Sequence, residues 1–122
     1  MQTRRFPRFP TDRSVTAVIF WDDLPIRKVH GRCHLLSEGG LGATLTDQLY
    51  VGDVVRLDMV PLPSIYAKVC NTQGTRHGFQ FLFQEHGQRR AIAEACAAAE
   101  RAMRWEEEWA QRAKDGGPES AD

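Results

Sequence analysis

The feature that most constrains this chain is a series of short segments with alternating apolar and polar residues, which ends shortly before Gly87. Alternation with a period of two places successive side chains on opposite faces of a β-strand. The pattern predicts six strands, at residues 15–21, 27–36, 41–45, 54–60, 65–70 and 77–83. Turn residues such as Asp, Asn, Gly and Pro separate them. This arrangement predicts a mainly β protein, a small six-stranded antiparallel β-barrel.

After Gly87 the periodicity becomes helical, and Ala, Glu and Arg, which all favour helix, predominate. Apolar side chains recur three and four residues apart and predict a buried stripe on a long C-terminal helix. The stripe consists of Ile92, Ala95, Cys96, Ala99 and Met103. Trp105 and Trp109 lie outside it. They either fold onto the barrel, which we favour, or form an interface with a partner.

The 122 residues are enough for one domain with a single core. We expect a flexible arginine-rich arm at 1–14, a barrel at 15–86, a helix at 87–114 and a disordered tail at 115–122. Sixteen Lys and Arg residues balance sixteen Asp and Glu residues, so the net charge is zero. This balance argues against a protein that binds nucleic acid through a basic surface.

No apolar run is long enough to insert into a membrane, and no apolar signal core follows the first residues. Three widely spaced cysteines argue against a disulfide framework and for a reducing compartment, so we expect a cytoplasmic protein. His30 and His34 share a strand face about 13 Å apart, while Cys33 points the other way, so we expect no metal site. No catalytic motif is present, which predicts a protein that is not an enzyme.

The arm holds four arginines and one acid, Asp12, a local charge of +3. Pro7 and Pro10 oppose helix, so the arm should be extended. If the first two strands form a hairpin that turns near Leu24, Arg13 lies near Leu36. The arm then passes over the bend that follows Leu36.

The residues of that bend suit a small anionic ligand. Ser37 offers a hydroxyl, and Gly39 and Gly40 have no Cβ, so a ligand can approach the backbone and a positive φ is accessible. Arginine presents paired donors to phosphate oxygens and to the O6/N7 edge of guanine. The arm and the bend together therefore predict a clamp for a small nucleotide.

Two motifs resemble those of the PilZ domain family. Arg4 and Arg8 match its R-x-x-x-R motif, and Ser37 and Gly40 match its [D/N]-x-S-x-x-G motif, where residues 36–42 read LSEGGLG. The resemblance covers residues 4–86, with the helix in outline. It implies a six-stranded barrel with a C-terminal helix that binds cyclic di-GMP, a bacterial second messenger.

The resemblance also implies roles for single residues. Arg4 and Arg8 would grip phosphate and guanine, with Arg5 as a helper beside them. Ser37 would hydrogen-bond a guanine edge. Gly40, with the neighbouring Gly39, would let the ligand approach the backbone. No other cofactor is implied.

One position departs from the family pattern, because Leu35 stands where the family has Asp or Asn. Losing a charged hydrogen bond of this kind costs roughly 1.5–3 kcal/mol, or about 10- to 150-fold in affinity. His34 and Glu38 are neighbours that could compensate. Because some members of the family do not bind nucleotide, the affinity for cyclic di-GMP stays open.

Three functions remain to be separated. The first is a cyclic di-GMP receptor or adaptor that changes conformation on binding and regulates a downstream protein. The second is a protein-interaction module of the same fold that binds nucleotide weakly or not at all, which Leu35 and the tryptophans favour. The third, a barrel for single-stranded nucleic acid, is disfavoured by the neutral charge. The sequence leaves open a homodimer through the Ala-rich helix.

Overall fold

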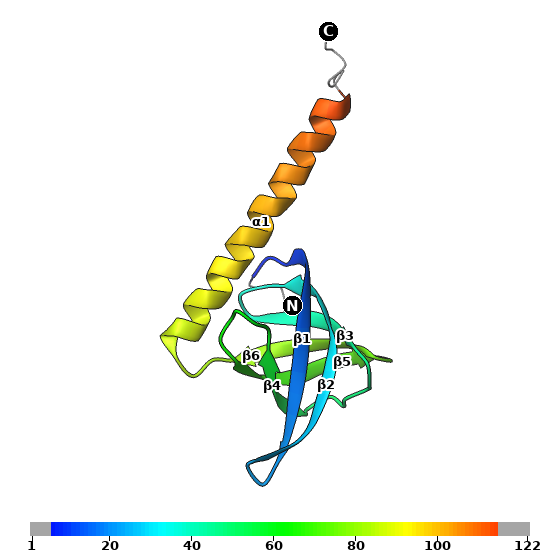
Figure 1. Ribbon diagram of the computed structural model, residues 1–122, viewed down its shortest axis with the longest axis vertical. Helices are drawn as coiled ribbons and strands as arrows, with labels where there is room; N and C mark the ends of the chain where they lie inside the picture. Colours follow the sequence, from blue (N-terminus) through cyan, green and yellow to red (C-terminus); the bar gives the residue numbers. More distant parts are fainter. Residues whose placement is uncertain (1–5, 115–122) are drawn as a thin grey trace, which may run out of the picture.

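A computed structural model describes residues 6–114 of the chain. Six antiparallel strands form a closed barrel in the order β1-β2-β3-β6-β5-β4, and one helix follows them (Figure 1). The elements are β1 Phe9–Trp21, β2 Leu24–Leu36, β3 Gly40–Leu45, β4 Val54–Asp58, β5 Ile65–Gln73, β6 Arg76–Leu82 and α1 His86–Lys114. The predicted fold class, a small six-stranded barrel with a long C-terminal helix, is confirmed.

The alternation that predicted the strands also selects the core. Val55 and Leu57 of β4 and Phe79 and Phe81 of β6 are buried inside the barrel, while the residues between them are partly or fully exposed. Phe83, the next apolar residue on that face, packs against the core from the chain that follows β6. The period of two thus places the β-branched and aromatic side chains inside, where their apolar surface leaves water.

The hairpin between β1 and β2 differs from the expected one. Its turn is Asp22-Asp23, with positive φ angles of 52° and 65°, and Trp21 pairs with Leu24. Two successive residues with positive φ make a two-residue turn whose twist matches the strands, and Asp tolerates this conformation better than most residues. The expected turn near Leu24 was therefore wrong.

The tighter turn moves every pair along the hairpin. Arg13 lies opposite Cys33 instead of Leu36, and Phe9 lies opposite Leu36. As a result β1 begins at Phe9, within the segment expected to be an arm, rather than at Val15.

A register shift between Cys33 and Leu35 interrupts the pairing of β2 with β3. Such a bulge reverses the alternation of side chains beyond it. Leu36 is consequently fully buried, whereas Leu35, expected on the same face as Val29 and Cys33, is only half-buried. The bulge turns Leu35 out of the core.

The start of α1 is tied to the barrel through Gln88. Its Oε1 accepts hydrogen bonds from the backbone N–H groups of Gln84 and Glu85, at 2.7 and 3.1 Å. Its Nε2 donates to the carbonyl oxygen of Ser64 at 2.9 Å. These bonds satisfy backbone groups at the helix start and fix the direction in which the helix leaves the barrel.

The first half of α1 covers the barrel with the predicted stripe. Ile92, Ala95 and Cys96 are buried in the core cluster, and Ala99 and Met103 are half-buried. The second half of the helix extends away from the barrel (Figure 1). Within residues 6–114, no helix combines the length and the apolar character that crossing a bilayer requires.

Trp105 and Trp109 are 57% and 53% exposed. The expectation that they fold onto the barrel was wrong, because this part of α1 lies beyond the reach of the strands (Figure 1).

Candidate functional site

A groove of about 400 Å³ opens on the outside of the barrel. Its walls are Arg8 from the segment before β1, the end of β2 with the following bend and β3, and the facing parts of β5 and β6. The volume is within the range of small-molecule sites in proteins. Polar and basic side chains line it beside exposed backbone of the glycine-containing bend.

The segment before β1 lies against the bend. The ring of Phe6 is close to Gly39, where a Cβ would be 3.0 Å from the ring. Arg8 lines the groove together with Ser37, Gly39 and Gly40. The hairpin register explains this placement, because pairing of Phe9 with Leu36 brings residue 8 next to Ser37. Arg4 and Arg5, the other two arginines expected to bind the ligand, lie outside the described residues.

Ser37 holds the bend in shape. Its backbone N–H donates to the carbonyl of Gly40 at 2.9 Å, and its Oγ accepts from the N–H groups of Gly39 and Gly40 at 3.2 and 3.1 Å. The hydroxyl also donates to the Gly40 carbonyl at 3.2 Å. These bonds use the whole hydrogen-bonding capacity of the hydroxyl. A ligand that contacts Oγ must therefore replace one of them.

The two glycines of the bend serve different purposes. Gly40 is buried where β3 meets β6, and a Cβ there would lie 2.0 Å from the carbonyl oxygen of Phe79. This contact requires glycine, whatever the residue does for a ligand. Gly39 is more open, because a Cβ there would meet only the Phe6 ring. Among the glycines from Gly31 to Gly87, Gly52 and Gly74 have positive φ, so the bend does not use the positive φ that glycine allows.

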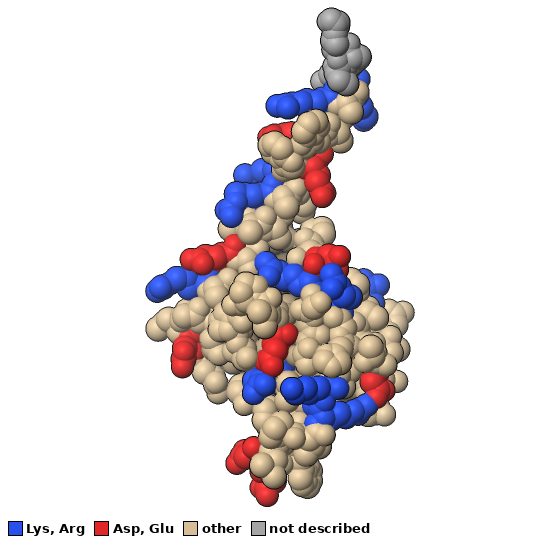
Figure 2. All heavy atoms as spheres, viewed as in Figure 1, with Lys and Arg blue, Asp and Glu red and all other residues tan. Residues whose placement is uncertain are grey.

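Two arginines bring positive charge to the groove, Arg8 from one wall and Arg76 from the start of β6. Among residues 6–114, neither makes a hydrogen bond or an ion pair. On the face shown in Figure 2, acidic and basic side chains are otherwise interspersed, in keeping with the zero net charge. Unpaired guanidinium groups in a groove are available to an anionic ligand.

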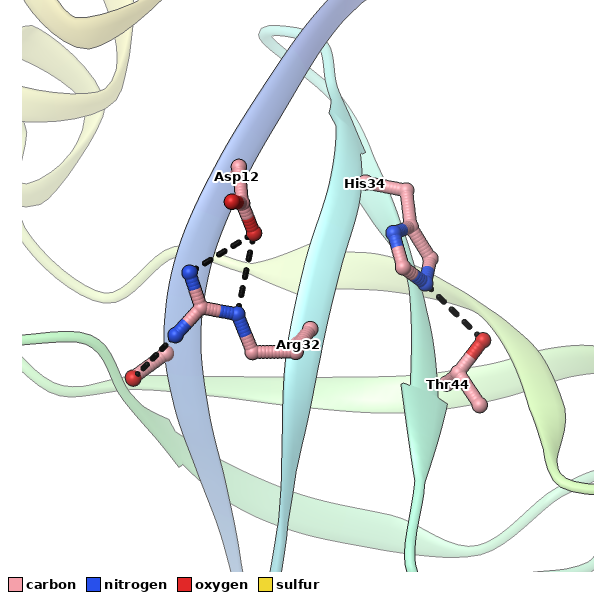
Figure 3. A network of polar contacts seen from close by, with 5 residues as sticks. Asp12, Arg32, His34 and Thr44 are labelled. Carbon is pink, nitrogen blue, oxygen red and sulfur yellow. Dashed lines mark hydrogen bonds and ion pairs between the residues drawn. The ribbon is translucent and has the colours of Figure 1, made fainter.

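Asp12, the acid nearest to Arg8 along the chain, is already neutralised. Its Oδ1 accepts from Nε and Nη2 of Arg32, at 2.9 and 2.7 Å (Figure 3). The third nitrogen of the Arg32 guanidinium donates to Oγ of Ser14 at 2.8 Å. Arg32 therefore binds the carboxylate across the β1–β2 hairpin, and Asp12 does not compete for Arg8.

His34 and Leu35 form part of the groove wall at the end of β2. Nε2 of His34 lies 2.9 Å from Oγ1 of Thr44 on the neighbouring strand β3 (Figure 3). The Leu35 side chain lies beside Gly42, with 3.7 Å between its Cβ and the position that a Cβ of Gly42 would take. The position at which the family motif has Asp or Asn thus faces the groove with an apolar side chain.

The sequence analysis did not identify the residues on the opposite wall. Asn71, Arg76 and Gln80 line the groove from β5 and β6. Their polar character on the outward face of a strand was visible in the sequence. Their proximity to Arg8 was not, because it results from the pairing of β3 with β6 across a long stretch of chain.

Within the part of the chain from Phe6 to Lys114, no three His, Cys, Asp or Glu side chains gather as a metal site would require. Cys33 and Cys96 are buried free thiols, and Cys70 is an exposed one at the groove. In the described structure, the groove presents arginine, amide and backbone groups.

Residues 2–98 match the model of the PilZ domain family. Similar solved structures include the PilZ domain with c-di-GMP of YcgR from Escherichia coli, with 19% identity, a TM-score of 0.72, and 88% of this chain and 98% of that chain covered. The PilZ domain of CeSA from a cellulose-synthesizing bacterium has 19% identity and a TM-score of 0.62, with 77% and 98% covered.

YcgR from Escherichia coli in complex with c-di-GMP has 22% identity and a TM-score of 0.70; the match covers 90% of this chain and 51% of that one. At these identities, the structures show a shared fold. Among curated proteins, none matches the chain. The family match extends over most of the sequence, and it includes the segment before β1, the bend and the first half of α1. The chain belongs to the PilZ domain family.

Proposed function

We propose that this protein is a cyclic di-GMP receptor or adaptor module, and not an enzyme, that regulates a downstream protein in the bacterial cytoplasm. The observation that carries this proposal is the position of Arg8 beside the Ser37–Gly40 bend in one groove of a PilZ domain. The structure of the YcgR PilZ domain with c-di-GMP supports the choice of ligand.

Cyclic di-GMP presents two phosphates and two guanines, and the groove offers groups suited to both. The guanidinium of Arg8 can bind a phosphate or the O6/N7 edge of guanine, and its plane can stack on a base. Arg76 supplies a second unpaired guanidinium from the opposite side. Arg4 and Arg5 join them when the ligand binds. Binding would fix residues 1–8, the segment before β1, over the bend and present a changed surface to a partner.

The weak point of this site is Leu35, which offers no hydrogen bond to guanine. His34 and Asn71 line the same groove and carry polar atoms. We propose that acceptor atoms of these two side chains replace part of the lost interaction, because a neutral imidazole nitrogen and an amide oxygen can both accept from a guanine N–H group. A charged hydrogen bond is worth roughly 1.5–3 kcal/mol, so the affinity for cyclic di-GMP depends on how much of that free energy these side chains restore.

The second candidate is a protein-interaction module that binds nucleotide weakly or not at all. The apolar Leu35 in the groove and the exposed tryptophans of α1 favour it. A partner that still co-purifies after Arg4→Ala and Arg8→Ala substitution, combined with no nucleotide binding by the parent protein, would support this function over the first.

Isothermal titration calorimetry with cyclic di-GMP tests the proposal, with GTP as the control ligand. We expect the protein to bind cyclic di-GMP and not GTP. The Arg8→Ala variant should lose most of this binding, and the Arg76→Ala variant should have an affinity lower by about 10-fold or more, because each substitution removes a charge-assisted hydrogen bond. Arg90→Ala is the matched control, since Arg90 is exposed on α1 outside the groove. Absence of heat at hundreds of micromolar ligand would leave the second candidate.

A further inference from the structure

The second half of α1 carries an uncovered apolar face. Trp105 and Trp109 are more than half exposed, and their rings contact each other edge to face, with centroids 6.0 Å apart at 79°. The Arg112 guanidinium lies 5.7 Å from the Trp109 ring on the same face. Adjacent exposed aromatic side chains on a helix that extends beyond its own domain mark an interaction surface.

This face has the spacing of a coiled-coil seam. Ala98, Ala102, Trp105, Trp109 and Arg112 follow one another at intervals of four, three, four and three residues, and all are exposed. Intervals of this kind define the a and d positions of a heptad. The ion pair between Glu100 and Arg104, at 2.6 Å, lies on the other side of the helix and suits a water-facing surface.

We propose that this seam binds the same seam of a second copy of the chain, with the two helices antiparallel. In that orientation each a position faces a d position of the other helix. Trp109 then packs on Ala98 of the second copy, and Trp105 packs on Ala102. Each of these layers combines one large and one small side chain, so the helices can approach evenly between Ala98 and Trp109.

A parallel pair fits worse. It would place Trp105 on Trp105 and Trp109 on Trp109 at one end, and Ala98 on Ala98 at the other, so the helices would be forced apart at the tryptophans. It would also bring Arg112 against Arg112, two like charges at the seam.

The charges beside the seam match the antiparallel pair. Arg101 and Glu108 occupy the g positions, directly before an a position. In the antiparallel register, Arg101 of each copy faces Glu108 of the other, which gives two opposite-charge contacts related by a two-fold axis. One helix carries the two alanines, the two tryptophans and both charges of the interface, so the seam is complementary to itself. That self-complementarity selects a second copy over an unrelated protein.

Sedimentation equilibrium of the full chain between about 1 and 200 µM tests the association. We expect a reversible dimer, and a dimer dissociation constant raised about 30-fold or more by Trp105→Ala together with Trp109→Ala. Trp21→Ala is the matched control, because Trp21 is 74% exposed but lies on the β1–β2 hairpin. A monomer throughout this range, with helical circular dichroism intact, would overturn the proposal and assign the face to another protein.

Charge reversal tests the partner and the register together. Arg101→Glu alone and Glu108→Arg alone should each weaken the dimer. Combining both in one chain should restore it, and mixing the two single variants should produce a heterodimer in preference to either homodimer. Failure of both rescues would exclude the antiparallel register.

Spin labels on Lys114→Cys, in a Cys70→Ser background that removes the exposed thiol, report the orientation. The antiparallel register separates the two labels by about 30 Å along the helix axis, whereas a parallel pair brings them side by side. A single short distance would overturn the proposal. None of these measurements involves cyclic di-GMP, so their outcome is independent of the ligand proposed for the groove.

Discussion

Leu35 is the single residue on which the proposed affinity depends most. The bulge after Cys33 turns its side chain toward the groove, where Arg8 and Ser37 also lie. A carboxylate at this position would meet the ligand from the same wall. The backbone therefore presents position 35 to the groove, but the leucine side chain there lacks a hydrogen-bonding group.

Substitution Leu35→Asp should strengthen binding of cyclic di-GMP by about 10- to 150-fold, because it adds a charged acceptor for the guanine N–H groups. Calorimetric titration of both proteins with the same ligand measures the change. Leu24→Asp serves as the control, since it adds the same charge at a residue that is 64% exposed on the β1–β2 hairpin. An unchanged or lower affinity of Leu35→Asp would show that position 35 does not contact guanine.

At the scale of the elements, β3 approaches β6 closely at its first residue, beside the groove. Gly40 pairs with Gln80, and a Cβ at position 40 would lie 2.0 Å from the Phe79 carbonyl oxygen. At Gly42, two residues further along β3, an added Cβ would lie 3.7 Å from its nearest neighbour, Cβ of Leu35. The two glycines share a strand but differ in the space around them.

This difference predicts opposite outcomes for the same substitution. Gly40→Ala should lower the free energy of unfolding by about 1–3 kcal/mol or more, because the backbone of β6 must shift. Gly42→Ala should change it by less than about 1 kcal/mol, since an added methyl group makes ordinary contacts there. Urea unfolding followed by far-ultraviolet circular dichroism measures both. Equal effects would mean that the β3–β6 approach does not determine stability.

At the scale of the whole molecule, two buried thiols lie where α1 covers the barrel. Cys33 belongs to β2 and Cys96 to α1, and both are in the core cluster. Burial raises the pKa of each thiol from 9.0 to about 11. For Cys33 the nearby charge of Arg13 acts in the opposite direction, and for Cys96 the charge of Glu38 adds to the rise.

A raised pKa means that the folded state holds these protons more tightly than the unfolded chain. The resulting stability is fully present below pH 9 and is lost as the pH rises through 11, with a slope of up to about 1.4 kcal/mol per pH unit for each thiol. Urea unfolding between pH 8 and 11 should show this loss. The slope should be smaller in Cys33→Ala with Cys96→Ala and unchanged in Cys70→Ala, whose thiol is exposed. Equal slopes in all three proteins would assign the loss to other groups.

The sequence by itself determined the number of strands, most of their inward faces and the buried stripe of the helix. These properties depend on the periodicity of apolar residues, which is a local property of the sequence and does not depend on the tertiary structure. The alternation of Val55 and Leu57 in β4 and the spacing of Ile92 and Cys96 in α1 were therefore readable without coordinates. The motif residues Arg8 and Ser37 were also visible, because a short motif is local.

Only the tertiary structure decided what surrounds those motifs. The Asp22-Asp23 turn set the hairpin register, and the bulge after Cys33 turned Leu35 outward. Both features depend on the strand pairing that is most stable in the closed barrel. Pairing of β3 with β6 brought Arg76 to the groove that Arg8 lines. Such contacts join residues far apart in the chain, so their geometry follows from closing and packing the barrel as a whole rather than from any local pattern.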